Sequence, residues 1–227
     1  MDKLNFDVQT DLLKAIQGKA DSVYFEGKGL KLQDISLSEF KIKTDDIDVN
    51  PLKVLFGEVE LNQPINAETR IVLKEADINQ ALKLEFIRDL LHEFLTFHTE
   101  ESIVSIYPKN IQFRLPGNSK IIVEGEIILD SGLEKKPLDF KADVRLQSLE
   151  KPIVLDELKC NTPEGIELEI IVALIDKIYK LRKAPYFKFK DVALRINTLE
   201  VQQGSIILFA QAHLQQIPEN ISFMSSN

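Results

Sequence analysis

The sequence predicts an α+β protein in which a curved, many-stranded antiparallel sheet wraps against a long helix in the C-terminal half of the chain. Two patterns support this fold class. Apolar and polar residues alternate over several long stretches, as in strands that bury one face and leave the other in water. Residues 161–185 instead place apolar residues at helical spacing. No linker or low-complexity segment divides the 227 residues, so we expect a single domain over residues 1–227.

The two ends of the chain are expected to differ from this sheet. Val8 to Ile16 has the spacing of a short amphipathic helix, and Gly18 stands where a helix terminator would. Residues 1–18 are therefore predicted to hold an N-terminal helix. Residues 219–227, which follow Pro218, are expected to be a frayed tail.

The first third of the chain predicts strands interrupted by one short helix. Apolar residues two positions apart between residues 23 and 42 indicate several short strands. Asn50 is a good N-cap and Pro51 suits the first helical position, so we expect one or two helical turns there. Strands are expected to resume over residues 59–61 and 67–73.

Residues 72–94, VLKEADINQALKLEFIRDLLHEF, are predicted to pass from a strand end into two helices. Glu75 and Asp77 fall in the first turn of the first helix, where the helix dipole favours negative charge. The apolar phase shifts at Leu84, so a break and a second helix are expected there. We expect His92 to face outward from that second helix.

Three long strands are predicted downstream. Apolar and polar residues alternate strictly over residues 138–146, which is typical of a strand with one face in water. Residues 121–129 and 206–214 are similarly long and carry doubly apolar patches. Those patches indicate that both faces of these two strands are covered at one end.

The segment 161–185 is predicted to form a helix of about five turns. Thr162 is expected to cap it, Pro163 to start it and Pro185 to end it. Its first half also alternates as a strand would, but the helical spacing that follows favours a helix. Apolar residues cover most of its circumference near residues 170–175, so we expect it to be enclosed on most sides.

The sequence contains no recognisable catalytic or metal-binding motif. His92 and His98 are six residues apart, whereas two metal ligands on one helix face need a spacing of four. His213 is expected on the wet face of a strand, and Cys160 is expected to be a small buried apolar residue. We therefore predict a protein that is not an enzyme and that holds no metal and no cofactor.

The composition restricts the partners and the location of the protein. A formal net charge of −8 disfavours nucleic acid, which needs a basic surface. No apolar run approaches the ~20 residues that span a bilayer, and the first residues do not resemble a secretory signal. The single Cys160 fits a reducing compartment. We expect a cytoplasmic protein whose contact with a membrane is peripheral; the oligomeric state is left open.

Residues 176–190, DKIYKLRKAPYFKFK, combine six basic residues with four aromatic ones. Two interpretations stay open. Cations in the last turn of a helix complement its dipole, and aromatic residues before a strand pack in a core. Alternatively, the segment contacts lipid headgroups or a membrane surface. Under the second interpretation the contact residues are Lys180, Arg182, Lys183, Tyr186 and Lys188.

Residues 20–82 resemble a known family. The matching features are Asn50-Pro51-Leu52 with Phe56-Gly57 and Leu61, the stretch Pro64 to Ala67, and the EADINQAL box from Glu75 to Leu82. They are similar to the DUF2993 family, the phospholipid-binding proteins related to mycobacterial LmeA, in the branch common in cyanobacteria. The later half resembles the family in pattern only. Lys74 departs from the Ser or Thr expected before the box, because a lysine side chain cannot accept a capping hydrogen bond.

The resemblance implies a fold similar to the tubular lipid-binding (TULIP-like) domains. It also implies non-enzymatic binding of a phospholipid or glycolipid in an apolar cavity between sheet and helix, with transfer or presentation of that lipid and transient contact with a membrane surface. A bound lipid would be the only ligand. The residues expected to line the cavity are Leu84, Ile87, Leu90, Leu91, Phe140, Val144, Ile171, Leu174, Ile175, Ile178, Ile206 and Leu208.

The same residues leave two other functions open. An ordinary packed core would explain each apolar position, and a protein with a filled core and an open sheet edge would be a structural or adaptor protein that binds a partner by strand addition. An enzyme acting on a lipid substrate would instead require Glu75, Asp77 or His92 to cluster at the mouth of a cavity.

Overall fold

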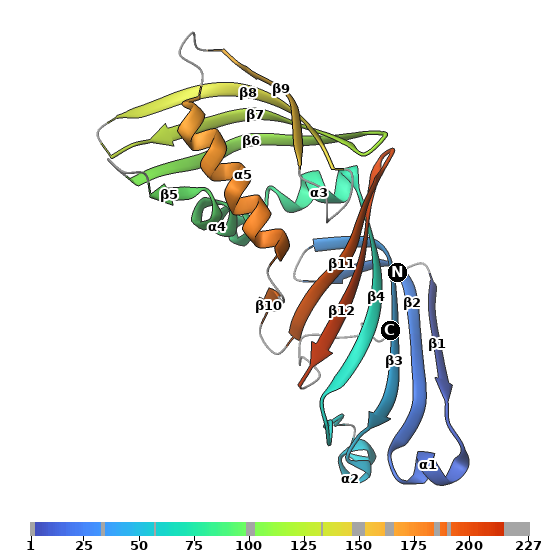
Figure 1. Cartoon of the computed structure of the whole chain (residues 1–227). Helices are drawn as coiled ribbons and strands as arrows, with labels where there is room; N and C mark the ends of the chain where they lie inside the picture. The colour runs from blue at the N-terminus through green and yellow to red at the C-terminus, as the bar shows by residue number, and fades with distance from the viewer. Residues whose placement is uncertain are drawn as a thin grey trace. The chain divides into compact units, whose positions relative to one another are not determined.

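The structure is a computed structural model (Figure 1). It describes residues 3–32, 35–56, 58–98, 103–132, 134–146, 153–161, 166–183, 187–189 and 192–215. These residues form the sheet-rich fold with few helices that the sequence predicts. Where the sequence predicts one domain over residues 1–227, the chain groups into two compact units, each described here by itself. Unit 1 contains Met1–Val72, Ala184–Leu199 and Ile207–Asn227, and unit 2 contains Leu73–Lys183 and Glu200–Ile206.

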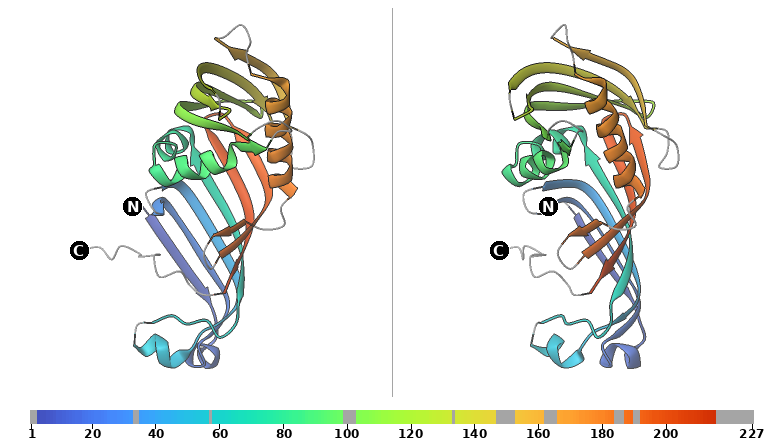
Figure 2. Two further views of the ribbon diagram at one scale, coloured as in Figure 1. Left: turned by 90° about the vertical axis from the view of Figure 1, so that its left-hand side faces the viewer. Right: turned by 60° about the vertical axis from the view of Figure 1, so that its left-hand side comes forward.

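Most of unit 1 is a seven-stranded sheet (Figure 2). Its first four strands pair antiparallel in chain order, and the last three strands of the chain complete it beside the fourth. Across the sheet the strands are β1 (Lys3–Gln9), β2 (Lys19–Leu32), β3 (Ile35–Asp48), β4 (Ile65–Lys74), β12 (Ser205–Leu214), β11 (Val192–Gln202) and β10 (Phe187–Phe189). The first and last parts of the sequence therefore share one sheet.

Strands β2 and β3 are longer than the sequence suggests. The several short strands expected between residues 23 and 42 join into two strands of 14 residues each, which pair without a register shift. Leu37 and Phe40 are both buried although they lie on opposite faces of β3, so the apolar residues of this strand do not keep to one face. Residues 59–61, expected to be a strand, contribute only a bridge between Val49 and Leu61.

The N-terminal helix begins later than predicted. Helix α1 spans Leu12–Ile16, and the residues before it form β1, so the prediction of a helix from Val8 onward was wrong. Phe6 and Val8 are two positions apart, and pairing with β2 satisfies the backbone groups of this segment. Asp11 caps α1, because its carboxylate accepts a hydrogen bond of 2.8 Å from the backbone N–H of Lys14.

Helices α1 and α2 are joined through their ends. Gly18 follows α1 with a φ of 77°, a left-handed conformation that glycine adopts without steric cost. A Cβ at this position would lie 2.2 Å from the carbonyl oxygen of Val49. The N–H of Val49 in turn donates a hydrogen bond of 2.8 Å to the carbonyl of Gly18. Asn50 caps α2 (Pro51–Leu55) as predicted. Gly57 lies outside the described residues.

Unit 2 contains a five-stranded antiparallel sheet and three helices (Figure 1). In order across the sheet the strands are β5 (Thr96–His98), β6 (Ile103–Gly117), β7 (Lys120–Asp130), β8 (Lys135–Arg145) and β9 (Val154–Cys160). Helices α3 (Glu75–Ala81) and α4 (Glu85–Phe94) precede it, with the predicted break at Leu84, and α5 (Leu168–Lys183) follows it.

Helix α5 packs against one face of this sheet through Ile170, which is buried in the unit 2 core. Ala173 and Leu174 pack against the same core. The helix begins at Leu168, later than predicted, and Thr162 and Pro163 lie outside the described residues. The unit 2 core consists of Phe97, Val104, Ile106, Ile127, Leu138 and Ile170.

Three hydrogen bonds connect α3, β6 and the turn between β11 and β12 in a closed ring. The N–H of Glu75 donates to the carbonyl of Gly204 at 2.9 Å, and the N–H of Gly204 donates to the carbonyl of Leu115 at 2.8 Å. The N–H of Leu115 closes the ring by donating to Oε2 of Glu75 at 2.7 Å. The turn carbonyl thus takes the first N–H of α3, which the side chain of Lys74 cannot accept, while Asp77 accepts the N–H of Lys74 at 3.2 Å.

Asn79 continues this contact along β6. Its Oδ1 accepts from the N–H of Phe113 and its Nδ2 donates to the carbonyl of Phe113, both at 2.8 Å. The same Nδ2 donates to the carbonyl of Glu75 at 2.9 Å. Strand β5 pairs with β6 only over residues 103–105, so the side chain of Asn79 substitutes for a neighbouring strand farther along β6.

We predict that Asn79→Ala lowers the free energy of unfolding by on the order of 3 kcal/mol, because both backbone groups of Phe113 lose their partner. Urea denaturation followed by circular dichroism measures this loss. The exposed neighbour Gln80 on the same helix provides the control variant Gln80→Ala. Equal stabilities of the two variants would contradict the role assigned to Asn79.

Candidate functional site

On strands β1 to β4 one face of the seven-stranded sheet is charged, and Glu26 of β2 makes several of its contacts. Its carboxylate accepts hydrogen bonds from the hydroxyl of Tyr24 at 2.6 Å and from Nδ2 of Asn5 at 2.9 Å. Lys41 of β3 pairs with it at 3.1 Å. These contacts, the Tyr24 hydrogen bond foremost, lower the pKa of Glu26 to about 2.

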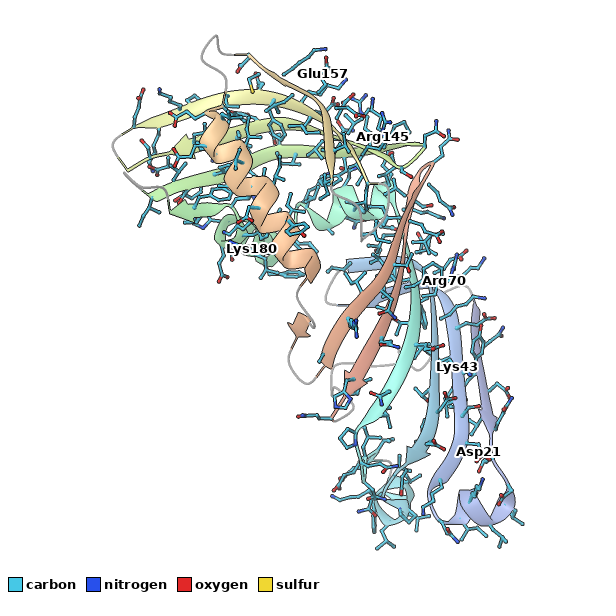
Figure 3. All side chains as sticks on the ribbon, viewed as in Figure 1. Asp21, Lys43, Arg70, Arg145, Glu157 and Lys180 are labelled. Carbon is cyan, nitrogen blue, oxygen red and sulfur yellow. The ribbon has the colours of Figure 1, made fainter. Side chains whose placement is uncertain are left out.

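The charged face extends across the neighbouring strands. Glu39 of β3 pairs with Lys28 of β2 at 3.3 Å and with Arg70 of β4 at 3.6 Å. Lys43, farther along β3, pairs with Asp45 at 3.6 Å. Figure 3 shows the side chains of Lys43 and Arg70 on these strands. Exposed ion pairs contribute little to stability individually, but together they keep this face solvated.

The opposite face of the same strands is mostly apolar and also includes Thr44 and Thr69. In the register of the sheet Phe6 lies opposite Phe25, and Phe25 lies opposite Ile42. The rings of Phe6 and Phe25 meet edge to face at 6.3 Å, and those of Phe25 and Phe40 are 5.0 Å apart. We call this surface the apolar face; it consists of Phe6, Val8, Val23, Phe25, Phe40, Ile42, Ala67 and Ile71.

Burial varies across the apolar face. Phe40 and Ala67 are buried, whereas Val23, Phe25 and Ile42 are only half-buried. At the edge strand β1, Phe6 is 64% exposed. The face therefore keeps apolar area in contact with water, and an apolar ligand that covers it would be favoured by the hydrophobic effect.

Side chains of α5 and of the five-stranded sheet meet in the unit 2 core. Lys177 fixes the helix there, because its Nζ donates to the carbonyls of Phe94 at 2.5 Å and Thr96 at 2.7 Å. The ammonium also lies 4.9 Å from the ring centre of Phe97, a cation–π contact. The cation meets the C-terminal carbonyls of α4, where the helix dipole favours positive charge.

The other side of α5 is apolar and exposed. Leu168, Val172, Ile175 and Tyr179 follow one another at spacings of four, three and four residues, which places them on one helix face. All four are exposed, Ile175 at 38%. We call these four residues the α5 stripe. The expectation that this helix is enclosed on most sides was therefore wrong for this side of it.

The residues expected to line a cavity occupy three kinds of environment. Phe140 and Leu174 pack against the unit 2 core, while Leu90 and Ile175 are exposed. The others are half-buried: Leu84, Ile87, Leu91, Val144, Ile171, Ile178, Ile206 and Leu208. The apolar face was not predicted as part of the site, although alternation in β2 and β3 is visible in the sequence, because alternation alone does not show whether a face is covered.

Most of the expected headgroup contacts lie beyond what the structure describes. The side chains of Arg182, Lys183 and Lys188 are outside the described part of the chain, as is Tyr186 entirely. Lys180 is exposed and pairs with Asp176, one helical turn earlier, at 2.7 Å (Figure 3). The role of this segment stays a prediction.

The carboxylates and histidine considered for catalysis are each engaged in a separate contact. Glu75 accepts from Leu115 in the ring of hydrogen bonds, and Asp77 accepts from the start of its own helix. His92 is half-buried and stacks on Tyr107 with ring centres 4.3 Å apart, so the expectation that it faces outward was wrong. Among the described residues no group of His, Cys, Asp and Glu has an arrangement that could hold a metal ion.

The single cysteine has a structural environment. Cys160 ends β9 and packs against the unit 2 core. Burial raises the pKa of its thiol, which disfavours the reactive thiolate at neutral pH. This agrees with the interpretation of Cys160 as a small apolar residue.

None of the helices in the part of the chain that the structure describes is long and apolar enough to cross a bilayer.

Comparison with known families identifies the kind of protein. A family model described as LmeA-like phospholipid-binding matches residues 6–211. Because this match covers most of the 227 residues, the chain belongs to the LmeA-like phospholipid-binding family. The resemblance found in the sequence is thereby confirmed. No curated protein and no solved structure matches the chain.

The low pKa of Glu26 predicts how stability depends on pH. The unfolded chain protonates this group near 4.5 and the folded chain near 2, so the unfolded state binds more protons between these values and stability falls as pH falls. Glu26→Gln should make the free energy of unfolding depend less on pH in this range, as measured by urea titrations at several pH values. The exposed Glu68 of β4 supplies the control Glu68→Gln. An unchanged pH dependence in Glu26→Gln would contradict this.

Proposed function

We propose that this chain binds an amphipathic lipid, a phospholipid or a glycolipid, without catalysing a reaction, and that the acyl chains lie on the apolar face of the seven-stranded sheet. The observation that carries the proposal is the division of this sheet into a charged face and a partly exposed apolar face. Membership in a phospholipid-binding family supports the class of ligand.

The energetics of such binding require apolar area more than polar chemistry. Each methylene removed from water contributes ~0.8 kcal/mol, so one long acyl chain supplies on the order of 10 kcal/mol. The half-buried positions of the apolar face offer side chains of matching character. We place the acyl chains there because Val23, Phe25 and Ile42 leave apolar area in contact with water.

Within unit 2, the α5 stripe is proposed as a separate apolar surface for lipid, since its side chains are exposed. A TULIP-like enclosure of the lipid, its transfer or presentation, and a cytoplasmic location with transient membrane contact stay predictions of the resemblance.

The first test is whether the purified protein carries lipid. Mass spectrometry of organic extracts from native protein should detect a phospholipid or glycolipid in near-stoichiometric amount, and delipidated protein should take up a fluorescent phospholipid. A bare protein that takes up no fluorescent lipid would overturn the proposal. That result would favour an adaptor protein, for which the sheet edges at β1 and β9 are the supporting observation.

We predict that Ile42→Glu reduces uptake of the fluorescent lipid by about tenfold or more, because it places a carboxylate in the middle of the apolar face. Lys43→Glu is the matched control, since it introduces the same group at the next position of β3 on the charged face. Thermal melts of both variants report folding. If both variants bind lipid as the wild type does, the apolar face is not the site.

A second pair of variants tests α5. Ile175→Glu should weaken uptake several-fold with little change in the melting temperature, because Ile175 is exposed in the α5 stripe. Leu174→Glu should instead destabilise unit 2, because Leu174 packs against its core. Full uptake by Ile175→Glu, measured by the same fluorescence titration, would remove α5 from the lipid contact.

A further inference from the structure

Helices α1 and α2 lie at the same end of the seven-stranded sheet. Lys19, at the start of β2, pairs in register with Asp48, at the end of β3, and α1 precedes the one residue while α2 follows the other. The bond between Val49 and Gly18 ties the two helix ends together. Both views in Figure 2 show the helices next to each other at this end.

These two short helices expose large apolar side chains to solvent. Neither helix contains a buried residue. Six of their residues, counting the C-cap of α2, are between 67% and 82% exposed. Isolated exposed apolar residues are normal, but such a concentration at one end marks an interaction surface. We call these six residues the apolar tip: Leu12, Leu13, Ile16, Leu52, Leu55 and Phe56.

The charges around the apolar tip are unfavourable for an anionic partner. Residues 11–21 and 45–60 contain three lysines and seven carboxylates. Each lysine has an acidic partner: Lys14 pairs with Asp21, Lys19 with Asp48 at 3.9 Å and Lys53 with Glu58 at 2.8 Å. These cations are therefore already neutralised, and the surface has a net negative charge.

The tip also lacks the polar groups of a specific protein interface. Apart from Lys14 and Lys53, the segments LLKAI and PLKVLF carry no polar side chain. Protein interfaces form about one hydrogen bond per 100–200 Å², whereas the acyl region of a bilayer requires none. The adjacent recess, lined by residues such as Lys19, Asp21 and Asp48, is polar and does not extend the apolar surface.

We propose that the apolar tip inserts into the interface of a zwitterionic lipid bilayer and docks the protein there by apolar contact, independently of anionic lipid. The tip adjoins the apolar face, because α1 connects β1 to β2 close to Val8 and Val23. Docking would bring the end of the apolar face to the membrane. The delivery of the apolar face to the membrane rests on the proposed function, whereas docking itself is measured separately.

Co-sedimentation with vesicles tests the docking. The full chain should bind vesicles of phosphatidylcholine alone, should bind no better when phosphatidylglycerol is added, and should keep its binding from about 0.1 M to about 1 M salt. The double variant Leu55→Glu/Phe56→Glu should bind about tenfold more weakly or worse, and Leu12→Glu/Ile16→Glu should do the same independently. The matched control is Leu90→Glu/Ile103→Glu, which alters exposed apolar residues of unit 2 and should bind as the wild type does.

Tryptophan fluorescence locates the insertion. Because the protein contains no tryptophan, a single introduced tryptophan reports on its own position. Phe56→Trp should show a blue shift on adding phosphatidylcholine vesicles and should be quenched by brominated acyl chains. Leu90→Trp should show neither effect. An unshifted spectrum for Phe56→Trp with vesicle-bound protein would overturn insertion of the tip.

The remaining outcomes also decide the matter. Absence of vesicle binding, equal loss in the Leu90→Glu/Ile103→Glu control, or binding that needs phosphatidylglycerol and disappears with salt would each overturn the inference. A dimer in sedimentation velocity that Leu55→Glu/Phe56→Glu dissociates would assign the tip to a second copy of the chain instead. Uptake of a short-chain fluorescent phospholipid without vesicles separates the two proposals: retained uptake with no docking defeats only this inference, and docking without uptake defeats only the proposed function.

Discussion

A β-strand must direct successive side chains to opposite faces of its sheet, and the two faces of the unit 1 sheet depend on this constraint. In β2, Tyr24 and Glu26 join the hydrogen-bonded charged face, while Val23 and Phe25 lie on the apolar face. Because β2 pairs with β3 without a register shift, the division continues into β3. One solvated face and one apolar face follow from the same alternation. The apolar face needs an apolar partner to leave water, and an acyl chain has that character.

In unit 2, side chains of α3 form the backbone hydrogen bonds that a neighbouring strand would otherwise make with β6. Glu75 and Asn79 are four residues apart on α3, so they project from the same side of the helix. There they contact the backbone of β6 at Leu115 and Phe113. Gly204 completes the ring from the β11–β12 turn. The EADINQAL box therefore has a structural role, since its acidic and amide side chains satisfy backbone groups that β5 leaves unpaired.

The sequence predicted the helices and strands better than it predicted what packs against each of their faces. The strands β7, β8 and β12, the cap at Asn50 and the helix break at Leu84 were all visible, because each depends on neighbouring residues. The sequence did not distinguish the environments of the adjacent residues Leu174 and Ile175, although Leu174 packs against the unit 2 core and Ile175 is exposed. Periodicity indicates which residues share a face, but it does not indicate what covers that face. For the same reason His92 was placed outward, although it stacks on Tyr107.

By itself the sequence determined the two-faced strands, the helix caps and the family, since alternation, capping and motif spacing are properties of short segments. Only the tertiary structure decided that Glu75 accepts a hydrogen bond from Leu115, 40 residues later, and that the carbonyl of Gly204 accepts the N–H of Glu75 in place of the cap missing at Lys74. It alone decided that α1 and α2 meet at one end of the sheet with their apolar side chains outside. The contacts of α3 and the meeting of α1 with α2 depend on which distant segments of the chain lie side by side. That arrangement is set by the pairing of whole strands.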